Sequence, residues 1–212
     1  MHNDRTELLQ DVARYYAEKL AAHGESPRGV DWNGEEGQVL RFAQLCKLIP
    51  EGTNDVSLLD LGCGYGAMLD YLRMRLDRVA YHGIDVSEEM VRAAEAHHAA
   101  HSDAQFSVDV PPGMRVDYSM ASGIFNVRLH HSDAAWQAHL HSTLDLLDRC
   151  SRKGFAFNCL TSYSDEDRKR SDLYYADPCG LFDLCKRRYA KDVALLHDYG
   201  LYEFTILVRK AP

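Results

Sequence analysis

The chain has 212 residues, of which 46% are hydrophobic, enough for the core of one domain and too many for a disordered protein. Lys and Arg number 24 and Asp and Glu 32, a net charge of −8 that disfavours phosphate backbones, so we expect no nucleic-acid partner. No apolar run reaches the length of a membrane span, and the charged first residues lack the apolar segment of a secretion signal. We therefore expect a cytoplasmic protein without membrane contact.

The first fifty residues are predicted to be helical. Apolar residues recur with helical spacing from Thr6 to Ala22, and residues 23–29 are rich in helix breakers. A second helix is expected to begin after Asn33 as its N-cap and to end before Pro50. We expect residues 1–50 to form a helical cap, or lid, and residues 51–212 to form the main domain of one compact unit.

From residue 56 onward, short apolar runs alternate with helical patterns. Strands are predicted at 56–61, 79–84, 105–110, 118–122 and 155–160, and helices at 67–76, 87–100, 134–150 and 178–189. Residues 193–197 and 204–208 flank a turn and are typical of a hairpin. The alternation predicts an α/β fold whose mostly parallel sheet carries helices on both faces, with one antiparallel strand from the hairpin.

The strongest motif is the segment LLDLGCGYG at 58–66, in which a buried strand runs through glycines into a helix. Glycine is needed where a ligand lies against the backbone, and open α/β sheets bind ligands at this carboxyl edge. The following strand ends at Asp85, 19 residues beyond Gly66, where a carboxylate can accept hydrogen bonds from both hydroxyls of a ribose. The glycines also fit the looser dinucleotide pattern, so alone they leave NAD and another nucleoside cofactor open.

Two helices precede this unit and a hairpin ends the chain, which favours a nucleoside cofactor other than NAD. The segment LLDLGCGYG together with IDVS at 84–87 resembles the class I S-adenosylmethionine (SAM)-dependent methyltransferases. The resemblance covers roughly residues 35–210. It implies a Rossmann-like sheet of seven strands with the last strand antiparallel, and SAM as the cofactor.

The resemblance also implies a set of cofactor-binding residues. The methionine end of SAM would be held by Asp60, Gly62, Cys63, Gly64 and Gly66. The ribose would be bound by Asp85, with Val86 beside it. The adenine would be lined by Val108 and Asp109, and the methionyl part by Ser122, although the segments around these three residues depart from the common family motif. Tyr16, with Tyr15 and Trp32, is a candidate for the lid over SAM.

Four residues are candidates for catalysis. Methyl transfer is a displacement at an activated carbon, so a protein has mainly to position the acceptor and in some cases to remove its proton. His130 could be a base near neutral pH, and Asn126 could orient an amine or a carboxylate. Tyr174 and Tyr175 could present their ring faces to the sulfonium. Structural alternatives are a helix-capping pair of His130 with His131, a turn cap for Asn126, and packing of the last helix for the tyrosines.

A metal site is not expected. His97 and His101 lie four residues apart on a predicted helix, a spacing that permits a metal pair, but we expect no carboxylate or cysteine to complete it. A solvated, alanine-rich helix is the favoured interpretation.

Three functions remain open. The first is methyl transfer to an oxygen or nitrogen atom of a small molecule, such as a sugar or natural-product intermediate, by a monomer or homodimer. The second is a SAM cyclase, in which the SAM amine attacks its own γ-carbon and gives azetidine-2-carboxylic acid and methylthioadenosine. Tyr174, Tyr175 and Asn126 would supply its aromatic wall and the acceptor for the amine proton, and it would need no partner beyond SAM. The third is a non-catalytic SAM-binding subunit, which the intact glycine motif disfavours.

Overall fold

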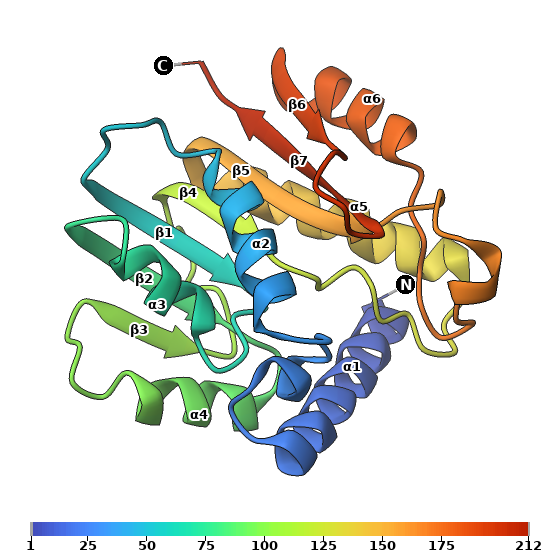
Figure 1. Ribbon diagram of the computed structural model, residues 1–212, viewed down its shortest axis with the longest axis horizontal. Helices are drawn as coiled ribbons and strands as arrows, with labels where there is room; N and C mark the ends of the chain where they lie inside the picture. The colour runs from blue at the N-terminus through green and yellow to red at the C-terminus, as the bar shows by residue number, and fades with distance from the viewer. Residues whose placement is uncertain (1, 212) are drawn as a thin grey trace.

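The computed structural model describes residues 2–211, with side chains from residue 5 onward, and contains a seven-stranded sheet in the order β3-β2-β1-β4-β5-β7-β6 (Figure 1). The strands are β1 (Asp55–Leu61), β2 (Arg78–Ile84), β3 (Ala104–Ser107), β4 (Val116–Ala121), β5 (Ser151–Leu160), β6 (Asp192–Leu196) and β7 (Glu203–Arg209). Neighbouring strands from β3 to β5 are parallel, whereas β7 is antiparallel to both β5 and β6. The predicted α/β fold, with its antiparallel last strand, is confirmed.

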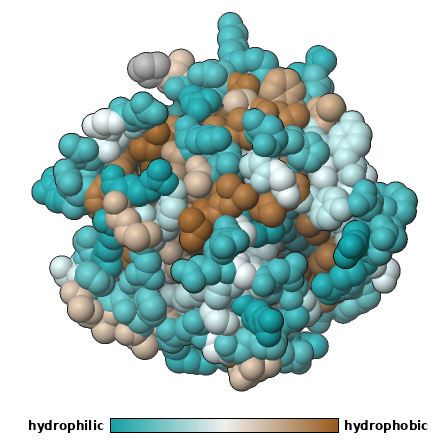
Figure 2. All heavy atoms as spheres, viewed as in Figure 1, coloured by the Kyte–Doolittle hydropathy of each residue, from teal (hydrophilic) through white to brown (hydrophobic). Residues whose placement is uncertain are grey.

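Helices cover both faces of the sheet. The helices are α1 (His2–His23), α2 (Glu35–Cys46), α3 (Ala67–Arg73), α4 (Glu88–His97), α5 (Asp133–Cys150) and α6 (Pro178–Arg188), with short 3-10 turns η1 (Pro27–Val30) and η2 (Glu166–Arg168). Helices α2 and α3 pack on one face, α5 and α6 on the other, and α4 packs beside β3. None of the helices between residues 2 and 211 combines the length and the apolar character needed to cross a membrane. The face drawn in Figure 2 is largely hydrophilic, with apolar side chains gathered in patches across its middle.

The alternation of side chains along β5 explains why both faces are covered. Phe155 and Phe157 point into the core beneath α5 and α6, whereas Ala156 belongs to the core beneath α2 and α3. On β7, Ile206 and Leu207 divide in the same way. Because consecutive strand residues face opposite sides, each apolar run of this sheet supplies two cores at once.

The first fifty residues do not behave as one element. Helix α2 packs on β5 and β7, and Phe42 and Leu45 belong to the central core. Helix α1 instead crosses the carboxyl ends of the strands, from α5 at its N-terminal end to α4 at its C-terminal end (Figure 1). Its contact with α5 is a small apolar cluster around Leu8, Val12 and Trp136. Only α1 and η1 therefore have the position of a lid, and a domain boundary at residue 50 stays a prediction.

The segment between β3 and β4 differs from its prediction. The third strand was expected to reach residue 110 but ends at Ser107, whose hydroxyl donates a hydrogen bond to the Asp109 carbonyl at 2.9 Å. Pro111, Pro112 and Gly113 then prevent a helix, and a loop leads directly to β4. The edge of the sheet beside β3 therefore keeps Val108 and Asp109 exposed at the end of the strand.

Candidate functional site

A cavity of about 270 Å³ opens at the carboxyl ends of β1, β2 and β4, beneath α1. Its wall contains ten residues that the sequence analysis assigned to SAM or its lid, namely Asp60, Gly62, Cys63, Gly64, Asp85, Val86, Val108, Asp109 and Ser122 on the sheet side and Tyr16 on α1. Trp32 also lines it, whereas Tyr15 instead donates a hydrogen bond to Asp31 at 2.7 Å. The eleventh predicted residue, Gly66, caps α3 behind the loop.

The glycine loop has a backbone that only glycine adopts easily. Gly62 has φ of +80°, and a Cβ there would lie 2.1 Å from the Ile124 side chain. Gly66 has φ of +88°, and a Cβ there would lie 2.7 Å from the ring of His98, which packs behind the loop and bonds the Gly66 carbonyl. The amides of Gly62 and Cys63 both donate to the Ile84 carbonyl, at 2.7 and 3.0 Å. These bonds tie the loop to the end of β2.

Asp85 is held rigidly at the end of β2. Its Oδ2 accepts a hydrogen bond from the Gly64 amide and its Oδ1 one from the Ser87 amide, each at 2.9 Å. Burial raises the pKa of this carboxyl, and the two amides partly oppose the rise. Each carboxylate oxygen retains a further acceptor position, so Asp85 can still receive the two hydroxyls of a ribose.

Asp60 is a buried carboxyl with one free oxygen. Tyr81 donates its hydroxyl hydrogen to Oδ2, while Oδ1 is buried without a hydrogen-bond partner among the described residues. Burial raises the pKa of Asp60 to about 7, the Tyr81 hydrogen bond opposes the rise, and the nearby Asp85 adds to it. A cationic group in the cavity would supply the missing partner and stabilise the charged carboxylate.

We expect the substitution Asp60→Asn to change how stability depends on pH. In the wild type the folded-state pKa lies above the unfolded value near 4, so the buried charge destabilises the fold increasingly as pH rises from about 4 to 7. The Asn variant cannot ionise, so its unfolding free energy relative to wild type should rise between pH 5 and 8. Denaturant unfolding at both pH values measures the change, with Asp77→Asn as a control. A pH-independent difference would contradict the raised pKa.

Four buried polar atoms in the cavity wall lack hydrogen-bond partners within the described chain: Asp60 Oδ1, Ser122 Oγ, His139 Nδ1 and Thr143 Oγ1. Buried polar atoms in proteins almost always have a partner, because an unpaired one costs free energy. Four of them around one cavity indicate that a polar ligand completes the site. The exposed side chains of Val86 and Val108 at the same cavity offer an apolar surface to a flat ring.

His139 and Thr143 form a part of the cavity that the sequence analysis missed. They project from α5 opposite Arg5 and Leu9 of α1. His139 is 8% exposed and Thr143 2% exposed, and the His139 ring contacts Trp136 with centroids 5.2 Å apart. Burial lowers the pKa of His139 to about 4, with a smaller contribution from Arg5, so the imidazole is neutral at pH 7. These two residues lie four apart on α5, beside the apolar stripe of that helix. A polar pair in this position is the sequence pattern that could have indicated that they line the cavity.

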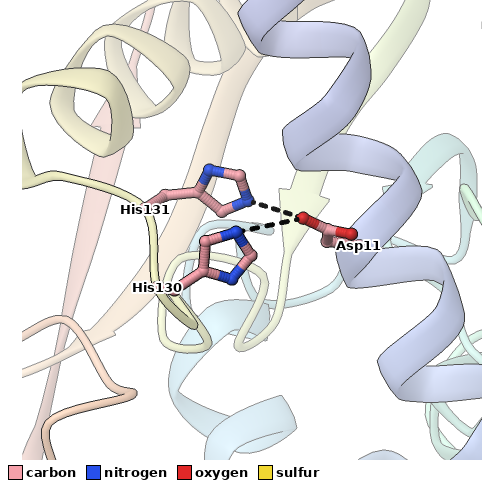
Figure 3. Close-up of side chains that lie close together, drawn as sticks. All are labelled: Asp11, His130 and His131. Carbon is pink, nitrogen blue, oxygen red and sulfur yellow. Dashed lines mark hydrogen bonds and ion pairs between the residues drawn. The ribbon is translucent and has the colours of Figure 1, made fainter.

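The four candidates for catalysis lie outside the cavity wall in the described structure. Asn126 accepts a hydrogen bond from the Leu160 amide at 3.0 Å, and the Tyr174 hydroxyl accepts one from Gln137 at 3.3 Å. The Tyr175 hydroxyl accepts one from the Arg170 amide at 2.9 Å. His130 is exposed and lies beside Asp11 of α1 (Figure 3). The contacts of Asn126, Tyr174 and Tyr175 join the loop at 170–176 to its neighbours, whereas His130 contacts α1.

The histidines of α4 also differ from expectation. His98 is 3% exposed rather than solvated, because its ring stacks on Phe106 behind the glycine loop. Carboxylates do accompany His97: Asp70 lies 3.0 Å from its Nε2, and Glu25 lies 2.9 Å from its Nδ1. The statement that no carboxylate accompanies this helix was therefore wrong, because both acids come from other elements. That the protein needs no metal stays a prediction.

A buried ion pair supports the wall beside Trp32. The Arg41 guanidinium stacks on the Trp32 ring at 3.8 Å and donates two hydrogen bonds to Glu203 of β7, at 2.7 and 2.9 Å. Asn158 of β5 donates to the same carboxylate at 2.8 Å and accepts from the Gly123 amide at 2.7 Å. The network thus links α2, β7 and β5 to the segment that follows β4.

Comparisons with known proteins agree with this geometry. Residues 59–149 match the family described as "Methyltransferase domain". The protein described as "Putative methyltransferase Rv1506c", from Mycobacterium tuberculosis, is 61% identical over 163 residues, which make up 77% of this chain and 98% of that protein.

Two solved structures show the same fold. The N-methyltransferase NodS from Bradyrhizobium japonicum WM9, in complex with S-adenosyl-L-homocysteine, has a TM-score of 0.66 and 14% identity, over 94% of this chain and 98% of that one. The DhpI-SAM-HEP complex has a TM-score of 0.65 and 15% identity, over 96% and 98%. These two likenesses show the fold, and the 61% identical relative, with the motif LLDLGCGYG, shows the family. The chain belongs to the class I SAM-dependent methyltransferase superfamily.

Proposed function

We propose that this protein transfers a methyl group from SAM to an oxygen or nitrogen atom of a small molecule. One observation carries the proposal: the cavity has unpaired buried polar atoms both at the strand ends and on α5. Asp60 and Ser122 mark the first region, and His139 and Thr143 mark the second. One continuous cavity with two polar regions can hold both a cofactor and an acceptor. Methyl transfer requires both, because the acceptor atom must lie in line with the methyl–sulfur bond of SAM.

SAM would occupy the region at the strand ends. The glycine loop and Asp60 would hold its methionine end, since the free Asp60 oxygen can accept a hydrogen bond from an ammonium group. Asp85 would receive the ribose hydroxyls, and Val86 and Val108 would cover the faces or edges of the adenine. When bound, SAM supplies a methyl carbon that its sulfonium has already activated.

The acceptor would occupy the region between α1 and α5. Leu9 and Val12 of α1 make this end of the cavity apolar, which excludes water and fixes the acceptor close to the methyl group. The neutral His139 imidazole can accept a hydrogen bond from a hydroxyl or an amine, and Thr143 can donate or accept one. The limited volume and the acidic surface favour a small acceptor over a nucleic acid.

The substitution His139→Leu is expected to lower kcat/KM for the acceptor at least about tenfold, because the acceptor loses a buried hydrogen-bonding partner. The dissociation constant of SAM should change less than about threefold. The thermal midpoint should rise, since leucine removes an unpaired buried nitrogen. S-adenosylhomocysteine formation, SAM titration calorimetry and thermal unfolding measure the three quantities. His141→Leu, on the exposed side of α5, is the control, and unchanged kcat/KM would contradict the assignment.

Incubation of the protein with SAM alone, followed by mass spectrometry, is the first test of the function. Intact bound SAM, and then S-adenosylhomocysteine in a screen of small hydroxyl and amine acceptors, is the expected result. Methylthioadenosine with azetidine-2-carboxylic acid would instead establish the cyclase. The residues on which that alternative relied, Tyr174, Tyr175 and Asn126, lie outside the cavity wall. SAM that does not bind would contradict both.

A further inference from the structure

A second group of polar side chains lies where α1 meets the loop that leads from β4 to α5 (Figure 3). Asp11 projects from α1, and His130 and His131 follow one another in the loop. Nε2 of His131 lies 3.1 Å from Asp11 Oδ2, and Nε2 of His130 lies 3.5 Å from the same oxygen. Imidazole nitrogens and a carboxylate oxygen, which are ligands for first-row transition metals, thus converge from two elements.

The spacing of these atoms suits a bound ion. Ligand atoms at about 2.0–2.2 Å from a tetrahedral Zn²⁺ lie roughly 3.3–3.6 Å from one another. The two nitrogen–oxygen distances, 3.1 and 3.5 Å, lie close to this range, and all three ligand atoms are within 4.8 Å of one another. Small rotations of the two imidazoles would therefore complete the geometry.

The backbone of the loop directs both imidazoles toward α1. Leu129, which precedes them, has φ of +57°, a conformation that residues other than glycine adopt at an energetic cost. Its amide donates to the Asp172 carbonyl at 2.8 Å, and the Arg128 guanidinium donates to the Ser171 carbonyl at 2.7 Å. The two rings are stacked, with centroids 4.4 Å apart. The loop is thus fixed before any ligand binds.

The surroundings leave room for an ion. Arg14 lies 3.5 Å from the other Asp11 oxygen, Oδ1, and is mostly exposed, so it does not occupy Oδ2. His130 is 72% exposed in its side chain, which leaves the outer side open for water to complete the coordination. A second group, Asp70, His97 and His98, also has three ligand atoms within 4.8 Å of one another, but it includes no residue of α1.

We propose that Asp11, His130 and His131 bind a divalent first-row transition metal ion such as Zn²⁺, and that the ion fastens α1 over the cavity. Leu9, Val12 and Tyr16 of the same helix line the cavity on either side of Asp11 in sequence. An ion that binds only when α1 is in place must favour the closed cavity, so metal and SAM strengthen each other's binding. The coupling to SAM rests on the proposed function, whereas the metal site does not.

Titration of Co²⁺ into the metal-free full chain, followed by visible absorption and by competition with Zn²⁺, tests the site. We expect one ion per chain. Asp11→Asn and His130→Ala should each weaken binding at least about tenfold, because each removes one of three protein ligands. His130 is so exposed that its variant should fold normally. His141→Ala and His97→Ala are matched controls that should bind the ion as the wild type does.

Several results would overturn the proposal. Absence of Co²⁺ binding in the wild type, or binding that survives both Asp11→Asn and His130→Ala, would exclude the site. Loss of binding in His97→Ala alone would place the ion at the α4 group instead.

Whether the ion holds α1 over the cavity is tested by its effect on SAM binding. Zn²⁺ should lower the dissociation constant of SAM at least about threefold in wild type and not in His130→Ala. An ion that binds without changing SAM affinity would overturn the fastening. A chain that binds the ion but never binds SAM would contradict the proposed function and leave the metal site standing.

Discussion

Replacing Asp85 with alanine is expected to weaken SAM binding at least about 100-fold. The carboxylate is positioned by the Gly64 and Ser87 amides and can receive two ribose hydroxyls. Hydrogen bonds to a charged group contribute about 1.5–3 kcal/mol each, so the loss of two corresponds to a factor of 100 or more. The variant also leaves the Gly64 amide without its partner, which loosens the loop that faces the methionine end.

Titration calorimetry with SAM measures this effect directly. Glu88→Ala is a suitable control, because Glu88 is an exposed acid three residues away whose ion pair with Arg92 lies on the surface. Thermal unfolding of the ligand-free Asp85→Ala variant shows whether the fold is retained. A folded variant that binds SAM with wild-type affinity would refute the ribose assignment, and with it the placement of SAM at the end of β2.

Replacing Glu203 with alanine is expected to destabilise the fold by about 3–5 kcal/mol. Glu203 is 1% exposed and accepts hydrogen bonds from both Arg41 and Asn158. Removing one partner of a buried ion pair leaves the other charge uncompensated, which costs far more than the pair itself contributes. For a chain of this size, the thermal midpoint should fall by roughly 10 °C. The stacking of Arg41 on Trp32 should loosen as well, and SAM binding should weaken.

The double variant Arg41→Met/Glu203→Leu separates the charge effect from loss of packing. Apolar residues of similar size should restore most of the stability, because no buried charge remains unpaired. Arg92→Ala, at an exposed ion pair, should change the thermal midpoint very little. A Glu203→Ala variant as stable as Arg92→Ala would show that this pair does not support the cavity wall.

The sequence by itself determined the architecture and the residues that line the cavity at the strand ends. Strand–helix alternation, the glycine motif and Asp85 are local patterns, set by residues within about 30 positions of one another. The carboxyl ends of adjacent parallel strands must lie side by side, so Asp60, Asp85 and Ser122 could be brought to one edge from their strand assignments alone. The predicted strand boundaries differ most at 105–110, where the strand ends at Ser107 before Pro111 and Pro112, and at 155–160, where β5 begins four residues earlier, at Ser151.

Only the tertiary structure decided which side chains line the cavity between α1 and α5. It also decided which side chains of α1 meet the loop that follows β4. His139 and Thr143 reach the cavity through the rotation of α5 on the sheet, which depends on how Leu140, Leu144 and their partners interdigitate. Asp11 and His131 are 120 residues apart, and they meet only because α1 crosses the strand ends. Helical and strand periodicity specifies which side of an element is apolar. The neighbour that packs against that side follows from long-range packing, which no local pattern encodes.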